Sequence, residues 1–100
     1  MTASFGTEVG AVLREALAVT AGDRQSRYGH PSVNLGERTA ALMQAYVSNM
    51  PNPDRWSATD VCNLMILLKV ARLQESPTDF DSLVDIAGYA SAAWEAAKGA

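Results

Sequence analysis

Apolar residues recur with a helical period in the first part of the chain. Five of them share one helix face, at Val9, Val12, Leu13, Ala16 and Leu17. This i, i+3, i+4, i+7, i+8 spacing is typical of a helix that buries one stripe, and it predicts a first helix over about residues 5–21. Gly22 favours the end of this helix, because glycine adopts the left-handed conformation common at helix C-termini.

A second helix is predicted after Pro31. Ser32 is a residue type that caps helices, and four residues beyond it follow a 4-3-4 spacing, at Leu35, Thr39, Leu42 and Tyr46. The predicted helix covers about residues 32–48. Pro51 and Pro53 end the pattern, because two prolines so close together cannot continue a helix.

The most apolar segment predicts a third helix over about residues 58–75. Ser57 and Asp60 have the spacing of a weak capping box at its start. Its apolar side chains point in nearly every direction around the helix, which favours a central position. A fourth helix is predicted over about residues 80–97. The sequence thus predicts a single all-α domain over residues 1–100, arranged as a compact four-helix unit.

Length and a stripe of small residues favour self-association. A chain of 100 residues buries only about two-thirds of its unfolded surface, so its own core is modest. Gly88 costs about 1 kcal/mol inside a helix. It shares a face with Ala92, so a second helix or a ligand is expected to approach closely there. We therefore expect a helical homo-oligomer.

Composition excludes several classes of function. Eight basic and eleven acidic residues give a net charge of −3, which argues against a nonspecific binder of duplex nucleic acid. The single cysteine, Cys62, excludes a disulfide framework within one chain. The first part of the chain contains charged residues and no long apolar run, so neither a signal peptide nor a membrane span is expected. The expected location is the cytoplasm.

A polar loop between the first two predicted helices is the first candidate for chemistry. It contains Arg24, Arg27, Tyr28, Gly29 and His30. Arginine forks bind phosphate through paired hydrogen bonds, a tyrosine ring stacks on a base, and a glycine lets the backbone approach a ligand. The alternative is a helix connector with solvated arginines and a tyrosine packed on the core. A histidine alone before a proline is also typical of an ordinary surface position.

Two pairs of charged residues mark the last two predicted helices. Lys69 and Arg72 share one side of an otherwise apolar helix, so they need carboxylate partners or face an anion site. Asp81 and Asp85 share a face of the last helix, where they either neutralise those cations or hold a divalent cation. Together with Asp60 they form a candidate ligand set for Mg²⁺, which prefers oxygen ligands.

Short motifs are spread over roughly residues 13–95. They are Gly22-Asp23-Arg24, Tyr28-Gly29-His30-Pro31, Asn34, Asp60-Val61, Lys69-Val70-Ala71-Arg72 and the segment from Asp81 to Tyr89. Taken in this order, they resemble a small phage and prophage family catalogued as a domain of unknown function. The resemblance implies a phage protein made in the cytoplasm of a bacterial host.

The arrangement is also distantly similar to the all-α nucleotide pyrophosphohydrolases of the MazG type. In that superfamily, acidic residues on helices bind Mg²⁺ and a nucleoside triphosphate. Its EExxE motif is absent here, and its ExxD spacing matches only Ser82 and Asp85. A further analogy is with small helical phage proteins that act as sponges for the cyclic nucleotide signals of bacterial immunity, through Arg, Lys and aromatic residues.

Three functions are open on the sequence alone, and the cation-rich loop favours the first. It is a non-catalytic binder of nucleotide or cyclic-nucleotide phosphates, such as an anti-defence sponge, without a cofactor. The candidate ligand-binding residues are Arg24, Arg27, Tyr28, Gly29, His30, Asn34, Lys69, Arg72 and Tyr89. The second is a Mg²⁺-dependent pyrophosphohydrolase with Asp60, Asp81 and Asp85 as metal ligands. The third is a helical adaptor or inhibitor that binds a protein through its apolar surface.

Overall fold

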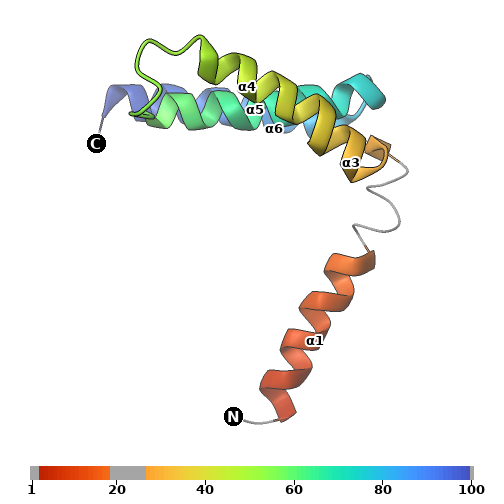
Figure 1. The fold of residues 1–100 in the computed structure, drawn as a ribbon. Helices are drawn as coiled ribbons and strands as arrows, with labels where there is room; N and C mark the ends of the chain where they lie inside the picture. Colours follow the sequence, from red (N-terminus) through yellow and green to blue (C-terminus); the bar gives the residue numbers. More distant parts are fainter. Residues whose placement is uncertain (1–2, 19–26, 100) are drawn as a thin grey trace.

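Helices make up most of residues 3–18 and 27–99, the part of the chain that the computed structural model describes, and these residues contain no strand. The elements are α1 (Ala3–Ala18), α3 (Pro31–Val33), η2 (Asn34–Thr39), α4 (Ala40–Ser48), α5 (Ala58–Glu75) and α6 (Phe80–Lys98) (Figure 1). The predicted all-α class is confirmed. The end of the first helix expected near residue 21, and its stop at Gly22, lie outside the described residues.

The second helical run begins at Pro31, where the expected cap is wrong. His30 rather than Ser32 is the N-cap, and its Nδ1 accepts a hydrogen bond from the Ser32 backbone N–H at 3.1 Å. Proline suits the first position of a helix, because the N–H that it lacks has no intrahelical partner there. The cap therefore shifts to the residue that precedes the proline.

η2 is a π-helical segment, and a side-chain hydrogen bond joins it to α5. Within it the Ala40 backbone N–H reaches back to the Leu35 carbonyl, the longer step that defines a π-helix. The Thr39 hydroxyl donates to the Asn34 carbonyl at 2.7 Å, and the Asn34 side-chain amide donates to the Ala71 carbonyl at 3.0 Å. Asn34 and Ala71 are both buried, so a polar contact joins η2 to the C-terminal part of α5, the helix over Ala58–Glu75.

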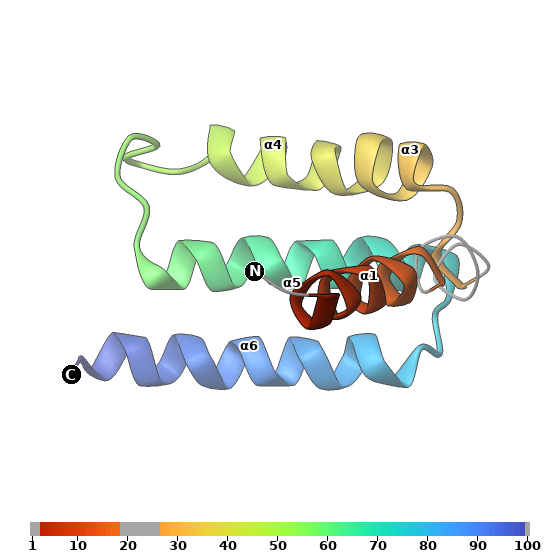
Figure 2. The ribbon, with the colours of Figure 1, turned by 90° about the horizontal axis from the view of Figure 1, so that it is seen from below.

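α5 lies between α4 and α6 in a single layer of helices (Figure 2). This agrees with the central position that its apolar pattern predicts. Its start is fixed by the expected capping box: the Ser57 hydroxyl accepts from the Asp60 backbone N–H at 3.1 Å, and the Asp60 carboxylate accepts from the Ser57 N–H at 2.8 Å. None of the described helices is long and apolar enough to span a membrane.

α1 stands apart from this layer (Figure 1), and the chain is open rather than closed into a bundle. Its radius of gyration is 16.8 Å, whereas about 13 Å is typical of a compact domain of this length. The chain exposes 6829 Å², whereas a compact protein of 10.6 kDa exposes about 5,500 Å². Large apolar side chains consequently face solvent on several helices.

Gly29 has a backbone φ of +83°, and this position provides a test of the fold. An alanine there would adopt a left-handed conformation, so Gly29→Ala should reduce the free energy of unfolding by about 1 to 2 kcal/mol. Gly36→Ala is the matched control, because a Cβ at this helical position meets open space and alanine favours helices. Urea unfolding of both variants measures the difference, and equal losses would contradict the assignment.

Candidate functional site

Five side chains meet where the chain enters α6, and we call them the Asp79 cluster: Arg27, Tyr28, Arg72, Asp79 and Ser82. The Asp79 carboxylate caps α6 by accepting from the Ser82 backbone N–H at 3.1 Å and from the Ser82 hydroxyl at 2.5 Å. It also accepts from the Tyr28 hydroxyl at 3.1 Å and from the Arg27 guanidinium. One carboxylate thereby joins the start of α6 to the segment that precedes α3.

The Asp79 carboxylate is buried and charged. Burial acts to raise its pKa, but hydrogen bonds from the Ser82 hydroxyl, Arg27, the Ser82 N–H and Tyr28 outweigh burial and lower the pKa to about 2. For Tyr28, burial raises the pKa first, and the hydrogen bond to Asp79 raises it further. Asp79 is therefore a fixed acceptor and Tyr28 a fixed donor at neutral pH.

Two guanidinium groups flank the ring of Tyr28. The Cζ atoms of Arg27 and Arg72 lie 5.1 and 4.6 Å from the ring centroid, within the range of cation–π contacts. Arg27 reaches the Asp81 carboxylate at 3.4 Å as well as Asp79. Arg72, by contrast, forms no ion pair with a carboxylate anywhere in residues 27–99. The Tyr28 ring is itself buried, so both cations are oriented by one aromatic residue.

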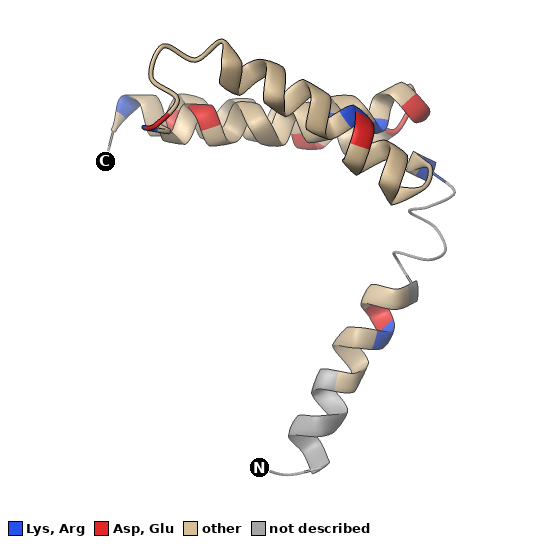
Figure 3. Ribbon diagram, viewed as in Figure 1, with Lys and Arg blue, Asp and Glu red and all other residues tan. Residues whose placement is uncertain are grey.

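Charges of both signs gather around this end of the layer (Figure 3). Lys69 and Asp85 pair at 2.8 Å, with side chains 11% and 45% exposed. Of the two roles that the sequence leaves open for Asp85, neutralising a cation of α5 is the one that the structure shows, whereas Asp81 lies beside Arg27. Arg38 and Glu75 pair at 2.8 Å, a contact that connects η2 to α5 and that the sequence analysis did not anticipate.

The other sequence-derived ligand residues are not all brought together. Gly29 lies beside the Glu75 carboxylate, His30 caps the second helical run, and Asn34 bonds to α5. Tyr89 lines a shallow hollow of about 310 Å³ on α6 together with Val84, Asp85, Gly88 and Ala92. A Cβ at Gly88 would meet open space. Arg24 lies outside the described residues.

The three aspartates proposed for Mg²⁺ lie in separate surroundings. Asp60 accepts from the Ser57 N–H and from the Tyr46 hydroxyl at 2.8 Å, and these hydrogen bonds lower its pKa. Lys69, the partner of Asp85, lies about 13 Å further along α5, at 1.5 Å of rise per residue. Across the described ranges, no three His, Cys, Asp or Glu side chains gather in a group that could hold a metal ion.

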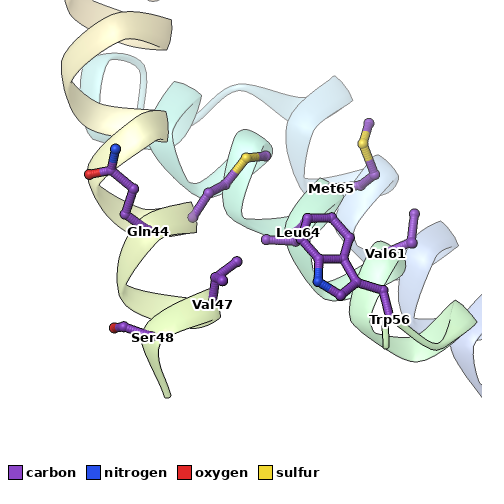
Figure 4. A pocket seen from close by; sticks show the side chains of 8 residues that line it. Gln44, Val47, Ser48, Trp56, Val61, Leu64 and Met65 are labelled. Carbon is purple, nitrogen blue, oxygen red and sulfur yellow. The ribbon is translucent and has the colours of Figure 1, made fainter. Parts of the chain in front are cut away.

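An apolar groove lies between α4 and α5, near the other end of the layer, and the sequence analysis missed it. It measures about 560 Å³ and is lined by Met43, Gln44, Val47, Ser48, Trp56, Val61, Leu64 and Met65. Figure 4 shows Val47 on α4 and Leu64 on α5 pointing toward each other, with the Trp56 ring on the α5 side. Two features of the sequence could have indicated it. The predicted helix over residues 32–48 carries no charged residue after Arg38, and Trp56 follows in the next connection.

Comparison with known proteins identifies the family. A family model described as "Domain of unknown function (DUF6378)" matches residues 11–97. The chain belongs to this family. Two relatives, the "Gene 55 protein" of Mycobacterium phage D29 and that of Mycobacterium phage L5, are each 39% identical over 79 residues, which is 79% of this chain. No solved structure matches.

The family assignment confirms the resemblance to a phage domain of unknown function. The similarity to MazG-type enzymes stays a prediction. The DUF6378 chain spans about half the length of the curated relatives that it matches, with 48% of the D29 protein and 47% of the L5 protein covered. The family model, over residues 11–97, covers every residue of the Asp79 cluster and of the apolar groove.

Asp79→Asn tests the carboxylate at the centre of the cluster. The amide keeps the shape but loses the charged acceptor, so the variant should lose about 1.5 to 3 kcal/mol of unfolding free energy at pH 7. Asp81→Asn is the control, because the Asp81 side chain is 73% exposed and its contact with Arg27 is long, at 3.4 Å. Its loss should stay within about 0.5 kcal/mol.

The free energy of unfolding of the same two variants should depend on pH in different ways. The pKa of Asp79 falls to about 2 in the folded chain, below the unfolded value of about 3.9. Its stabilisation is therefore complete above about pH 4 and is lost as the pH falls toward 2. Urea unfolding at stepped pH should show a steeper acid loss for the wild type and Asp81→Asn than for Asp79→Asn. Parallel curves for all three would contradict the role of Asp79.

Proposed function

We propose that this chain is a non-catalytic helical assembly module of a phage protein, which binds an amphipathic helix in the groove between α4 and α5. The observation that carries the proposal is the groove itself. Trp56 and Val61 line it while 53% and 48% exposed. Solvent-exposed apolar surfaces with polar rims are typical of protein interaction sites, and here Gln44 and Ser48 supply polar side chains at the groove.

The residue types of the groove fit a helix as its ligand. Grooves that bind amphipathic helices accept side chains at i, i+3, i+4 and i+7, and tryptophan and methionine are enriched at such interfaces. Met43 and Met65 lie on opposite sides of this groove, and methionine adapts to different partner surfaces. α4 carries no charged residue, so little desolvation of charge opposes docking.

The polar side chains at the other end of the layer support a structural role. Arg27 and Tyr28 each donate to the Asp79 carboxylate, and the Ser76 hydroxyl donates to the Arg27 carbonyl. These contacts bind α6 and the end of α5 to the segment before α3. We therefore propose that the apolar groove is the binding site and that the Asp79 cluster stabilises the layer of helices.

A synthetic peptide with the sequence of residues 3–18 tests the proposed groove. The chain used is full-length, with Trp94→Phe so that Trp56 is the only tryptophan. It also carries Leu13→Asp and Leu17→Asp so that its own first helix cannot compete. Titration of the peptide should shift Trp56 emission to shorter wavelength in a saturable manner, because docking removes the indole from water.

Two controls make this result specific. A peptide that carries the same two Leu→Asp changes should leave the emission unchanged, and so should a chain with Val47→Asp added in the groove. Identical responses to both peptides, or an undiminished response in the Val47→Asp chain, would contradict the proposal.

A second candidate function, nucleotide binding, is favoured by Arg72. Its guanidinium is held 4.6 Å from the Tyr28 ring centroid and forms no ion pair within the described residues. A guanidinium fork of this kind binds phosphate through paired hydrogen bonds. In this reading, the protein sequesters a nucleotide or cyclic nucleotide in the host cytoplasm.

Calorimetry against nucleoside triphosphates and cyclic dinucleotides, with and without Mg²⁺, tests this candidate. If Arg72 holds phosphate, Arg72→Lys should weaken binding by one to two powers of ten, about 1.5 to 3 kcal/mol, since an ammonium cannot reproduce the fork. Arg55→Lys, in the exposed loop before α5, should bind as the wild type does. Equal affinities for both variants, or no binding by the wild type, would reject nucleotide binding at Arg72.

A further inference from the structure

We infer that the helix bound in the groove is α1 of a second copy of this chain, so that two copies exchange their first helices. This inference rests on the proposed function, because it names the partner of the same groove.

The exposed area matches what a stable dimer requires. The 6829 Å² of accessible surface exceeds that of a compact chain of this mass by about 1,300 Å². A stable interface buries about 800 Å² on each partner. The surplus is therefore large enough for one full interface per chain, and it consists in part of large apolar side chains on α1 and beside the groove.

The surface of α1 has the chemistry that the groove accepts. Val12, Leu13 and Leu17 are 68%, 64% and 67% exposed, and they lie on one face at i, i+1 and i+5. Arg14 and Glu15 lie off the centre of this stripe. The 16 residues of α1 span about 24 Å and the 18 residues of α5, on one side of the groove, about 27 Å, at 1.5 Å per residue. An isolated helix of this length is marginal in water, so it needs a packing surface.

Symmetry favours a second copy over an unrelated partner. Each chain has one first helix and one groove. If each copy binds the first helix of the other, both grooves are occupied and no further copy can join through these surfaces. α1 stands away from its own layer (Figure 1), which leaves Val12, Leu13 and Leu17 exposed to solvent. Phe80 and Trp94 on α6 are 74% and 65% exposed, so apolar surface also continues along the layer outside the groove.

Thiol cross-linking between differently labelled chains tests the exchange. One full-length chain carries Leu13→Cys and the other Val47→Cys, both with Cys62→Ala so that each has a single thiol. After mixing and treatment with a short bis-maleimide, the inference predicts a shift from 10.6 kDa to a product of twice that mass, containing one chain of each kind. Ala11→Cys, on the opposite face of α1, replaces Leu13→Cys in the control and should give little of this product.

The outcomes separate this inference from the proposed function. If a chain with both Leu13→Cys and Val47→Cys links only within itself at low concentration, α1 occupies its own groove; the inference is then overturned while peptide binding still supports the groove. Equal product from Ala11→Cys and Leu13→Cys also overturns it. If the peptide of residues 3–18 fails to bind as well, the proposed function falls with it.

Discussion

The carboxylate of Asp79 is the contact on which the rest of this layer depends. It caps α6 through two donors of Ser82, accepts from Tyr28 and pairs with Arg27. Through these bonds it fixes where α6 begins, how the chain turns out of α5, and where the segment before α3 lies. Tyr28 in turn orients Arg72 on α5. A single charged acceptor thus organises elements that are distant in sequence.

The described residues form few buried apolar contacts, and several large apolar side chains remain exposed to solvent. The buried residues in the described part of the chain are Tyr28, Leu64 and Ala71 together with Asn34, Thr39, Lys69, Asp79 and Ser82. Most of them are polar or charged, whereas Trp56, Phe80 and Trp94 face solvent. Hydrophobic burial dominates the stability of most domains. A chain that buries polar groups and exposes aromatic rings is therefore expected to gain much of its stability when its apolar faces are covered.

Local patterns in the sequence predicted much of the fold. The capping box of Ser57 and Asp60 marked the start of α5, and the all-round apolar pattern of that helix predicted its central position. The pairing of Asp85 with Lys69 is one of the roles that the sequence left open for this aspartate, beside a contact with Arg72 and the binding of a divalent cation. These features depend on residues close in sequence or on one helix face, where periodicity is informative.

Other features depend on contacts that no local pattern reveals. One is the bond from the Asn34 side chain to the Ala71 carbonyl, which joins the π-helical turn of η2 to α5. Asp79 is not among the residues that the sequence analysis singles out, although an aspartate three residues before Ser82 at the start of an apolar run is a recognisable helix cap. The periodicity of α1 predicted a buried face, whereas Val12, Leu13 and Leu17 on that face are exposed in the structure. The groove at Trp56 emerges only when α4 and α5 are placed side by side.

Thermal unfolding as a function of chain concentration tests most directly whether the apolar faces of this layer are covered by a second copy. Circular dichroism would follow the melting temperature of the wild-type chain from about 1 to about 100 µM. If folding is coupled to pairing, this hundredfold increase adds about 2.7 kcal/mol per dimer and should raise the melting temperature by roughly 5 to 10 °C. A melting temperature that stays constant over the whole range would contradict the account.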